Sequence, residues 1–419
     1  MKKKNGYVLL ITVLLSIILI QWVIPPVLLQ LSKADEPQRK GKGKELSYYI
    51  NTYDQSLNRF LNYESMLKKT WKSVHHEKIQ VGKTGLTQDY MMADANGTRK
   101  NLIVLTAGVH GIEGYQGSAM LDVFQHEFLS KINPENTGIV IVHSVNPWGM
   151  KNFRRYNENN VDLNRNFIYN WKTFNLNKNK DYSDLAAFFE KNSGLGNSTL
   201  HEIGYYAGLG KEAVFSGTGK IQDALLTGQY TNPNGVYFGG NSDTDATKLL
   251  KKLYKSILKG PYSNIVHVDL HTGYGPRSQM SIFSSSNETM NQKEAEKAFN
   301  YPLVLTPDAE DYYVTNGDNT EYFNKLKQSI APDKTLYSTT FEFGTLGDDM
   351  PASIQSLKNT IDENRLYQHG SSSKITEKMI RNRYLQMFYP TDEKWRKKAV
   401  RDFRQGLNGV LVNRGIITR

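Results

Sequence analysis

The chain has 419 residues, of which 39% are hydrophobic and 22% are charged, and it contains no cysteine. This length suits one large α/β domain or two ordinary domains, and the lack of cysteine excludes disulfides and thiolate metal sites. The formal net charge is +11, but no basic helix, zinc-finger spacing or aromatic-basic sheet pattern accompanies it, so we expect a cationic surface and no nucleic-acid partner.

The first segment, residues 1–31, joins a basic start to a long apolar run. Three lysines at positions 2–4 precede VLLITVLLSIILI, and the apolar character continues to the end of the segment. This order directs insertion into a membrane with the N-terminus inside, and the length approaches the roughly 20 residues of a span. A signal peptide cleaved near Ala34 is the alternative, but the run is long for one, so we favour a retained anchor. Either way, the rest of the chain lies outside the cytoplasm, at the cell membrane or secreted.

The remaining chain divides into a tether and a domain. Residues 32–46 are charged and almost free of apolar side chains, which is typical of a flexible tether. We expect residues 47–419 to form one catalytic domain, and residues 1–31 to lie outside it. Apolar and aromatic residues recur at helical spacing over 48–73, which predicts a helix that packs on the domain.

Four short apolar runs predict buried strands at 101–108, 138–147, 264–273 and 339–345. An amphipathic pattern between the first two predicts a helix at 118–129. Strand, helix and strand in this order indicate an α/β fold with a mixed, mostly parallel sheet and helices on both faces. Open sheets of this class place their sites at the carboxyl ends of the strands, which is where the polar residues discussed below occur.

The interval 168–262 is rich in Asn, Lys, Gly and Tyr. We interpret it as an insertion that helps to wall the site, with helical patches at 183–191, 198–208 and 248–257. The tail at 393–407 is basic and amphipathic, and its pattern predicts a surface helix that packs through Trp395, Val400 and Phe403.

Two histidines and a glutamate suggest a metal centre. His110 and Glu113 lie three residues apart in a glycine-flanked turn, and His271 lies near the end of the third predicted strand. Two histidines and one carboxylate are the protein ligands of a catalytic zinc that keeps one position open. Each residue alone could equally be structural, and we expect His267, on the same strand face as His271, to be a core or supporting residue.

These segments together resemble the zinc carboxypeptidase family. The resemblance rests on GVHGIEG, RRYNENNVDLNRNF, DLHTG and FEFGT, in this order. A closer likeness to a poorly characterised bacterial branch of that family rests on GVHGIEGYQGSAM, GQYTNPNGVYFGG and FYPTDEKWR. The likeness covers roughly residues 48–410, and it implies a metallocarboxypeptidase-like fold with one zinc ion per chain.

The resemblance also implies a role for each matching residue of the metal centre. His110, Glu113 and His271 correspond to the zinc ligands. Glu342 corresponds to the catalytic carboxylate, and its alternation with two phenylalanines should point it into a polar cavity. Asp162 corresponds to the aspartate that orients the first histidine through a hydrogen bond.

Three further residues correspond to groups that bind the substrate. Arg155 stands nine residues before Asn164, which is the place of the arginine that polarises the scissile carbonyl, and Arg154 is the alternative for this role. Asn164 and Arg165 correspond to the pair that holds a terminal carboxylate, for which an arginine fork is suited.

The family's assisting tyrosine has no clear counterpart. Tyr312, Tyr313 and Tyr322 precede the catalytic glutamate, and their spacing does not choose among them.

The expected activity is removal of a C-terminal residue from a peptide, either a free peptide or the stem peptide of the cell wall. The alternatives are a zinc-dependent deacylase of N-acyl amino acids and an inactive membrane-tethered binding protein. No obligate protein partner is implied.

Overall fold

The computed structural model describes residues 2–33, 43–216, 221, 224, 227–309 and 315–418. Its centre is an eight-stranded sheet in the order β1-β2-β4-β3-β5-β8-β6-β7. The strands are β1 (Ser73–Gln80), β2 (Thr87–Asp94), β3 (Asn101–Ala107), β4 (Thr137–Val142), β5 (Asn264–Gly273), β6 (Met280–Ser284), β7 (Val304–Leu305) and β8 (Thr335–Gly344).

The four central strands are parallel, whereas antiparallel pairs lie toward both edges. β3 pairs in parallel with β4 and β5, and β5 pairs in parallel with β8. The β1–β2, β2–β4 and β6–β8 pairs are antiparallel. The predicted mixed, mostly parallel sheet is therefore confirmed, and the four predicted strands correspond to β3, β4, β5 and β8.

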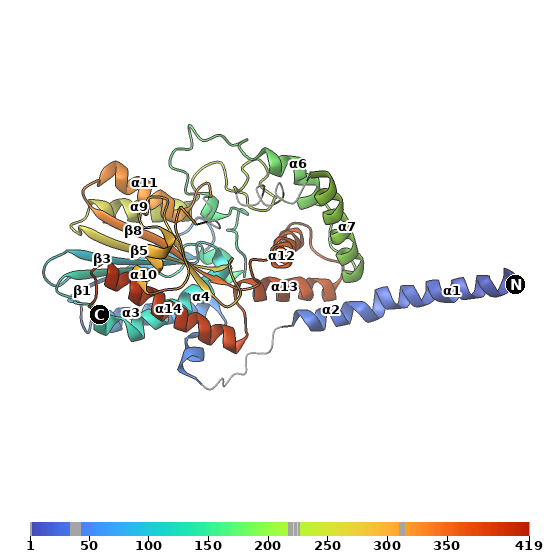
Figure 1. Ribbon diagram of the computed structural model, residues 1–419, viewed down its shortest axis with the longest axis horizontal. Coiled ribbons are helices and arrows are strands. Elements are labelled where there is room, and N and C mark those ends of the chain that lie inside the picture. Colours follow the sequence, from blue (N-terminus) through green and yellow to red (C-terminus); the bar gives the residue numbers. More distant parts are fainter. Residues whose placement is uncertain are drawn as a thin grey trace.

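Helices cover both faces of the sheet (Figure 1). The longer ones are α3 (Tyr53–Leu67), α4 (Gly114–Glu127), α6 (Lys180–Phe189), α7 (Ser198–Ser216), α9 (Asp245–Lys259), α10 (Gln292–Phe299), α11 (Asn319–Ile330), α12 (Met350–His369), α13 (Lys374–Phe388) and α14 (Glu393–Asn413). Short turns of helix are η2 (Lys44–Tyr48), η3 (Gly111–Glu113), η4 (Leu129–Lys131), α5 (Pro147–Lys151) and η5 (Leu163–Arg165). Helices therefore occupy all the predicted helical segments, with shifted ends.

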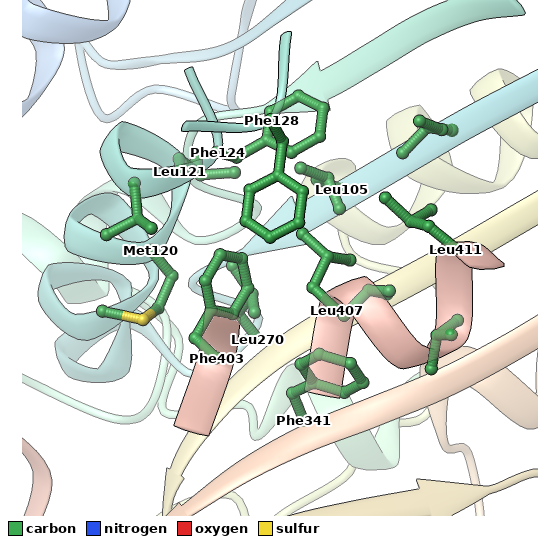
Figure 2. Packing of buried hydrophobic residues seen from close by; sticks show 14 of the residues in the cluster. Leu105, Met120, Leu121, Phe124, Phe128, Leu270, Phe341, Phe403, Leu407 and Leu411 are labelled. Atoms are coloured by element: carbon green, nitrogen blue, oxygen red, sulfur yellow. The ribbon is translucent and has the colours of Figure 1, made fainter. Parts of the chain in front are cut away.

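The alternation of side chains along each central strand builds two cores. Ile103 and Leu105 of β3 join the core beneath α3, α4 and α14, whereas Leu102 and Val104 join the core beneath α9 and α11. Figure 2 shows the first of these cores, in which side chains of α4 and α14 meet those of β3, β5 and β8. The tail helix α14 packs through Trp395, Val400 and Phe403, as predicted. Burial on both faces explains why the central strands are continuously apolar.

The N-terminal segment forms a long, kinked helix. α1 (Lys2–Ile18) continues through a π-helical turn, η1 (Leu19–Val23), into α2 (Ile24–Ser32). Two prolines occupy the first turn of α2, where the backbone N–H groups that they lack could not bond within α2. The stretch Ile11–Ser32 is long and apolar enough to cross a membrane.

The segment at residues 1–31, which we expect to lie outside the domain, contacts the domain near its end. Leu28 and Leu29 of α2 pack against a small apolar cluster on α12 and α13, and Ser32 is buried. The predicted tether, residues 32–46, falls mostly outside the described residues. Its last residues begin η2, where Lys44 forms an ion pair with Glu127.

Candidate metal centre

His110 and Glu113 occupy the turn between β3 and α4. His110 precedes η3, and Glu113 ends it. A Cβ atom at Gly111 would lie 2.2 Å from the carbonyl carbon of Gly149, so this position requires glycine. The close approach lets the backbone N–H of Gly111 donate to the carbonyl of Arg155. One turn therefore holds two candidate ligands and fixes the loop that carries Arg155.

His271 and Glu342 come from the carboxyl ends of neighbouring parallel strands. They are paired across β5 and β8 in the register of the sheet. Phe341 and Phe343 point into the core on either side of Glu342, so the carboxylate points the other way. The backbone N–H of Thr272 donates to Oε2 of Glu113 at 3.0 Å and ties the turn to the strand.

The three candidate ligands converge and are buried. Nδ1 of His110 lies 2.8 Å from Oε1 of Glu113, and Nδ1 of His271 lies 3.0 Å from Oε2 of the same carboxylate. The two Nδ1 atoms are 3.2 Å apart. One donor atom from each residue can be chosen so that all lie within 4.8 Å of one another, and these side chains could hold a metal ion.

Each histidine is held by an aspartate on its other nitrogen. Nε2 of His110 lies 3.0 Å from Asp162, and Nε2 of His271 lies 2.9 Å from Asp269. If each Nε2 carries the ring hydrogen and donates to its aspartate, each Nδ1 presents a lone pair. Two lone pairs and a carboxylate then face one another with no hydrogen between them, and a metal cation would stabilise that arrangement. The residues present therefore fit a metal.

The pKa shifts of Glu113 and His271 also indicate that these side chains fit a metal. Burial disfavours the ionised form of Glu113, but His110 and His271 outweigh it and lower the pKa of Glu113. Burial also disfavours a charged His271, but Asp269 and Glu113 raise the pKa of His271 well above its usual range. Both shifts express one property, namely that these side chains stabilise a positive charge at their centre.

Arg155 lies beside the metal centre, and Arg154 does not. Nε of Arg155 donates to Asp162 at 2.9 Å, and Nη1 donates to Glu113 at 3.3 Å. Arg154 instead donates to Glu363 through Nε and Nη2, and its guanidinium stacks on the ring of Tyr367. The alternative role for Arg154 is therefore wrong, because its side chain is committed to a different ion pair.

Asn164 and Arg165 line the same cavity as the candidate metal ligands. This cavity has a volume of about 230 Å³. The side chain of Asn164 donates to Asp318 and accepts from the backbone N–H of Asn319. Nη1 of Arg165 donates to the carbonyl of Asn164 at 3.0 Å. Its Nε is buried with no hydrogen-bond partner among the residues that the structure describes. An anion in the cavity could supply that partner.

The carboxylate of Glu342 also lines this cavity and accepts from the backbone N–H of Tyr274 at 3.0 Å. Burial and the neighbouring Glu113 carboxylate raise the pKa of Glu342 to about 8. A cation among the three candidate ligands would oppose this shift, because an opposite charge favours the ionised form. Glu342 is therefore placed to exchange a proton with a molecule in the cavity.

The candidate tyrosines do not coincide with those that line the cavity. Tyr312 and Tyr313 fall outside the described residues. Tyr322 of α11 packs against the rings of Phe167 and Tyr169 in the loop before α6 and does not line the cavity. The cavity is instead lined by Tyr237 and Tyr274, which sequence reasoning missed. The signal for Tyr237 was present, since it lies in the GVYFGG part of a motif that carries the family resemblance.

One protein-family profile matches most of the chain. The family described as "Protein of unknown function (DUF2817)" matches residues 49–402. The chain belongs to the DUF2817 family. The resemblance to a poorly characterised branch agrees with this result. The comparison with curated proteins found no match.

Solved structures similar to this DUF2817 chain include a fibrinolysis inhibitor, a carboxypeptidase and an amidase. Bovine thrombin-activatable fibrinolysis inhibitor, solved with a tick carboxypeptidase inhibitor, is 15% identical over 80% of this chain and 98% of that chain, with a TM-score of 0.41. Carboxypeptidase A from Helicoverpa armigera is 12% identical over 81% and 80%, with a TM-score of 0.43. Murein-tripeptide amidase MpaA from Escherichia coli O157 is 17% identical over 69% and 91%, with a TM-score of 0.33. At these scores the likeness is partial, and chemistry must be inferred from the side chains of the DUF2817 chain itself.

Proposed function

We propose that this protein is a zinc-dependent hydrolase that removes a C-terminal residue from a peptide outside the cytoplasm. The observation that carries the proposal is the convergence of His110, Glu113 and His271 beside Glu342 and Arg155 in one cavity. Imidazole nitrogens with one carboxylate suit zinc, and a three-ligand set leaves a position open. When bound, zinc would polarise a carbonyl group and increase the acidity of water.

Two neighbouring side chains supply the proton transfer and the charge stabilisation that amide hydrolysis needs. Glu342 accepts a proton from the attacking water and returns it to the leaving amine. The guanidinium of Arg155 can turn from Glu113 toward the scissile carbonyl and stabilise the negative charge that develops on its oxygen. Its remaining contact with Asp162 would keep the side chain in position.

The proposed zinc binding can be tested at Asp269, to which the sequence analysis gave no role. Asp269 holds His271 from behind, so Asp269→Asn is expected to lower zinc affinity by about 10- to 100-fold while preserving the fold. Competition with a chromophoric chelator measures this affinity. Asp89→Asn is a matched control, because Asp89 pairs with His76 at 2.8 Å in the outer strands. Unchanged affinity in Asp269→Asn would contradict the role of this residue.

The proposed preference for substrates with a free C-terminal carboxylate rests on Arg165. This buried guanidinium faces the cavity and has an unpaired nitrogen among the described contacts, and Asn164 beside it is the neutral donor of the proposed pair. A bidentate carboxylate is the natural partner for such a fork. We therefore assign the free carboxyl end of the substrate to this end of the cavity.

Arg165→Ala is expected to raise KM by about 10- to 100-fold for substrates with a free C-terminal carboxylate, since charged hydrogen bonds contribute roughly 1.5–3 kcal/mol. A C-terminally amidated version of the same peptide is the control substrate. It should be cleaved poorly by both proteins and with little difference between them. Equal losses on both substrates would show that Arg165 acts on the fold and does not bind the carboxylate.

A deacylase of N-acyl amino acids is the second candidate, because the same Arg165 would bind the carboxylate of the amino-acid product. Peptides and N-acyl amino acids assayed side by side distinguish the two activities. An inactive binding protein is the third candidate, and the presence of Glu342 in the cavity argues against it.

The apolar N-terminal helix supports attachment to the membrane, and the packing of Leu28 and Leu29 on the domain favours a retained anchor over a cleaved signal near Ala34.

A further inference from the structure

The buried side of helix α7 contacts the domain through Tyr205 and Leu209, which join an apolar cluster with α6 and α12, and through charged residues. Lys358 of α12 is fully buried and forms ion pairs with Glu202 of α7 and with Asp362. His201 of α7 lies 2.7 Å from Asp362, and Arg383 of α13 donates to Glu202 at 2.6 Å. The charged residues His201 and Glu202 of this helix therefore face α12 and α13, whereas a helix on a protein surface normally turns its charged residues to water.

The opposite side of α7 is apolar and uncovered. Leu200, Ile203, Tyr206 and Val214 are 52%, 57%, 47% and 81% exposed. The exposed positions between them include Ala207 and two glycines, with one charged residue, a lysine. Their spacing puts these residues along one stripe of the helix. An apolar stripe turned outward, above a buried ionic contact, indicates a surface that meets something apolar.

The N-terminal helix leaves the domain beside the start of α7. The side chain of Asn197, the residue before α7, donates to the carbonyl of Ile20 and to Gln21. Trp22, one residue further, is 76% exposed, and tryptophan is enriched at membrane surfaces. In Figure 1, α7 runs across the direction of α1, at the end of the domain from which α1 projects. A membrane crossed by α1 would therefore run alongside α7.

The length of the N-terminal helix that projects from the domain determines how close the bilayer surface comes to α7. Between Lys4 and Gln21 the helix rises about 26 Å, whereas the hydrocarbon core of a bilayer is roughly 30 Å thick. Further along, Leu28 and Leu29 of α2 pack against the domain. A helix of this length can span the core only if the bilayer surface reaches the level of Asn197, where α7 begins.

We propose that α7 lies in the surface of the outer leaflet, with Leu200, Ile203, Tyr206 and Val214 inserted among the lipids. This proposal rests on the proposed membrane attachment and adds a second point of contact. Two contacts fix the orientation of the domain on the membrane, which a single point of attachment could not do. The bilayer is preferred over a second protein chain because the apolar stripe adjoins the helix that enters the lipid.

The lack of cysteine in the chain permits a direct test. The full-length protein is reconstituted into vesicles of phosphatidylglycerol and phosphatidylcholine, with single cysteines introduced as Leu14→Cys, Ile203→Cys or Lys255→Cys and labelled with an environment-sensitive fluorophore. Lys255 is exposed on α9, away from α1, and serves as the control. Acyl-chain nitroxide lipids should quench the labels at 14 and 203 at least about twofold more than the label at 255.

Each other outcome overturns a separate statement. Quenching at 14 but not at 203 would show that the protein is anchored and that α7 does not touch the lipid. No quenching at 14 would overturn the membrane attachment itself. Disulfide-linked dimers of Ile203→Cys that form as readily in detergent as in vesicles, together with no lipid quenching, would assign the stripe to a second copy. Val214→Cys repeats the measurement at the other end of the same stripe and should agree with position 203.

Discussion

His271→Ala is expected to abolish zinc binding and hydrolysis together. The full-length wild-type protein should contain about one zinc ion per chain by elemental analysis, and the variant should contain almost none. In the proposed zinc site His271 is one of three protein ligands, so its loss should exceed the roughly 10- to 100-fold effect of a residue that merely orients a ligand. Its Nδ1 also lies within 3.2 Å of both other candidate ligands, and alanine leaves no donor there.

The control for this experiment must separate loss of the metal from loss of the fold. His126 is a half-exposed histidine on α4, and its Nε2 lies 3.6 Å from the carboxylate of Asp122. His126→Ala should retain a full complement of zinc. His110→Ala should behave like His271→Ala, and the thermal unfolding of all the variants reports on their folding. A well-folded wild type that takes up no zinc after repeated addition would contradict the metal centre and favour a binding protein.

The parts of the fold that could be predicted are those in which a single physical signal dominates. β3 and β5 are buried on both faces, so their sequences are continuous apolar runs. β1 and β2 were missed, because β1 is an edge strand with one buried residue and shows no such run. β7 has only two residues. The helix α12 was also missed, because polar side chains such as Lys358 and Asp362 are buried there by pairing with each other and with residues of α7.

The site could be predicted as a set of residues, but the partners of those residues could not. A turn with His110 and Glu113, and a strand ending near His271, have recognisable local patterns. Arg154 and Arg155 are adjacent and chemically identical, and only the fold shows that one pairs with Glu363 while the other reaches Asp162. Asp269 offered a clue that was not used, since it lies two residues before His271 on the same strand face.

Glu342→Gln is expected to lower kcat by about 100- to 10,000-fold with little change in zinc content or KM, because it removes a general acid–base while preserving the shape of the side chain. The amide oxygen of glutamine can still accept from the backbone N–H of Tyr274. Steady-state kinetics on the best substrate, with zinc measured on the same samples, tests this result. Glu64→Gln, at an exposed ion pair on α3, is the control for a lost carboxylate.

The combination of effects decides which part of the chemistry Glu342 performs. A fall in kcat with zinc and KM preserved means that the carboxylate acts during the reaction, since the ground-state complex forms as before. A fall in zinc content would place Glu342 among the groups that hold the metal. Unchanged kcat would contradict the proposed proton transfer, and a second carboxylate of the cavity would then have to carry the proton. Substrate bound by Glu342→Gln but not cleaved would also separate this enzyme from a binding protein, because the wild type must cleave what the variant only binds.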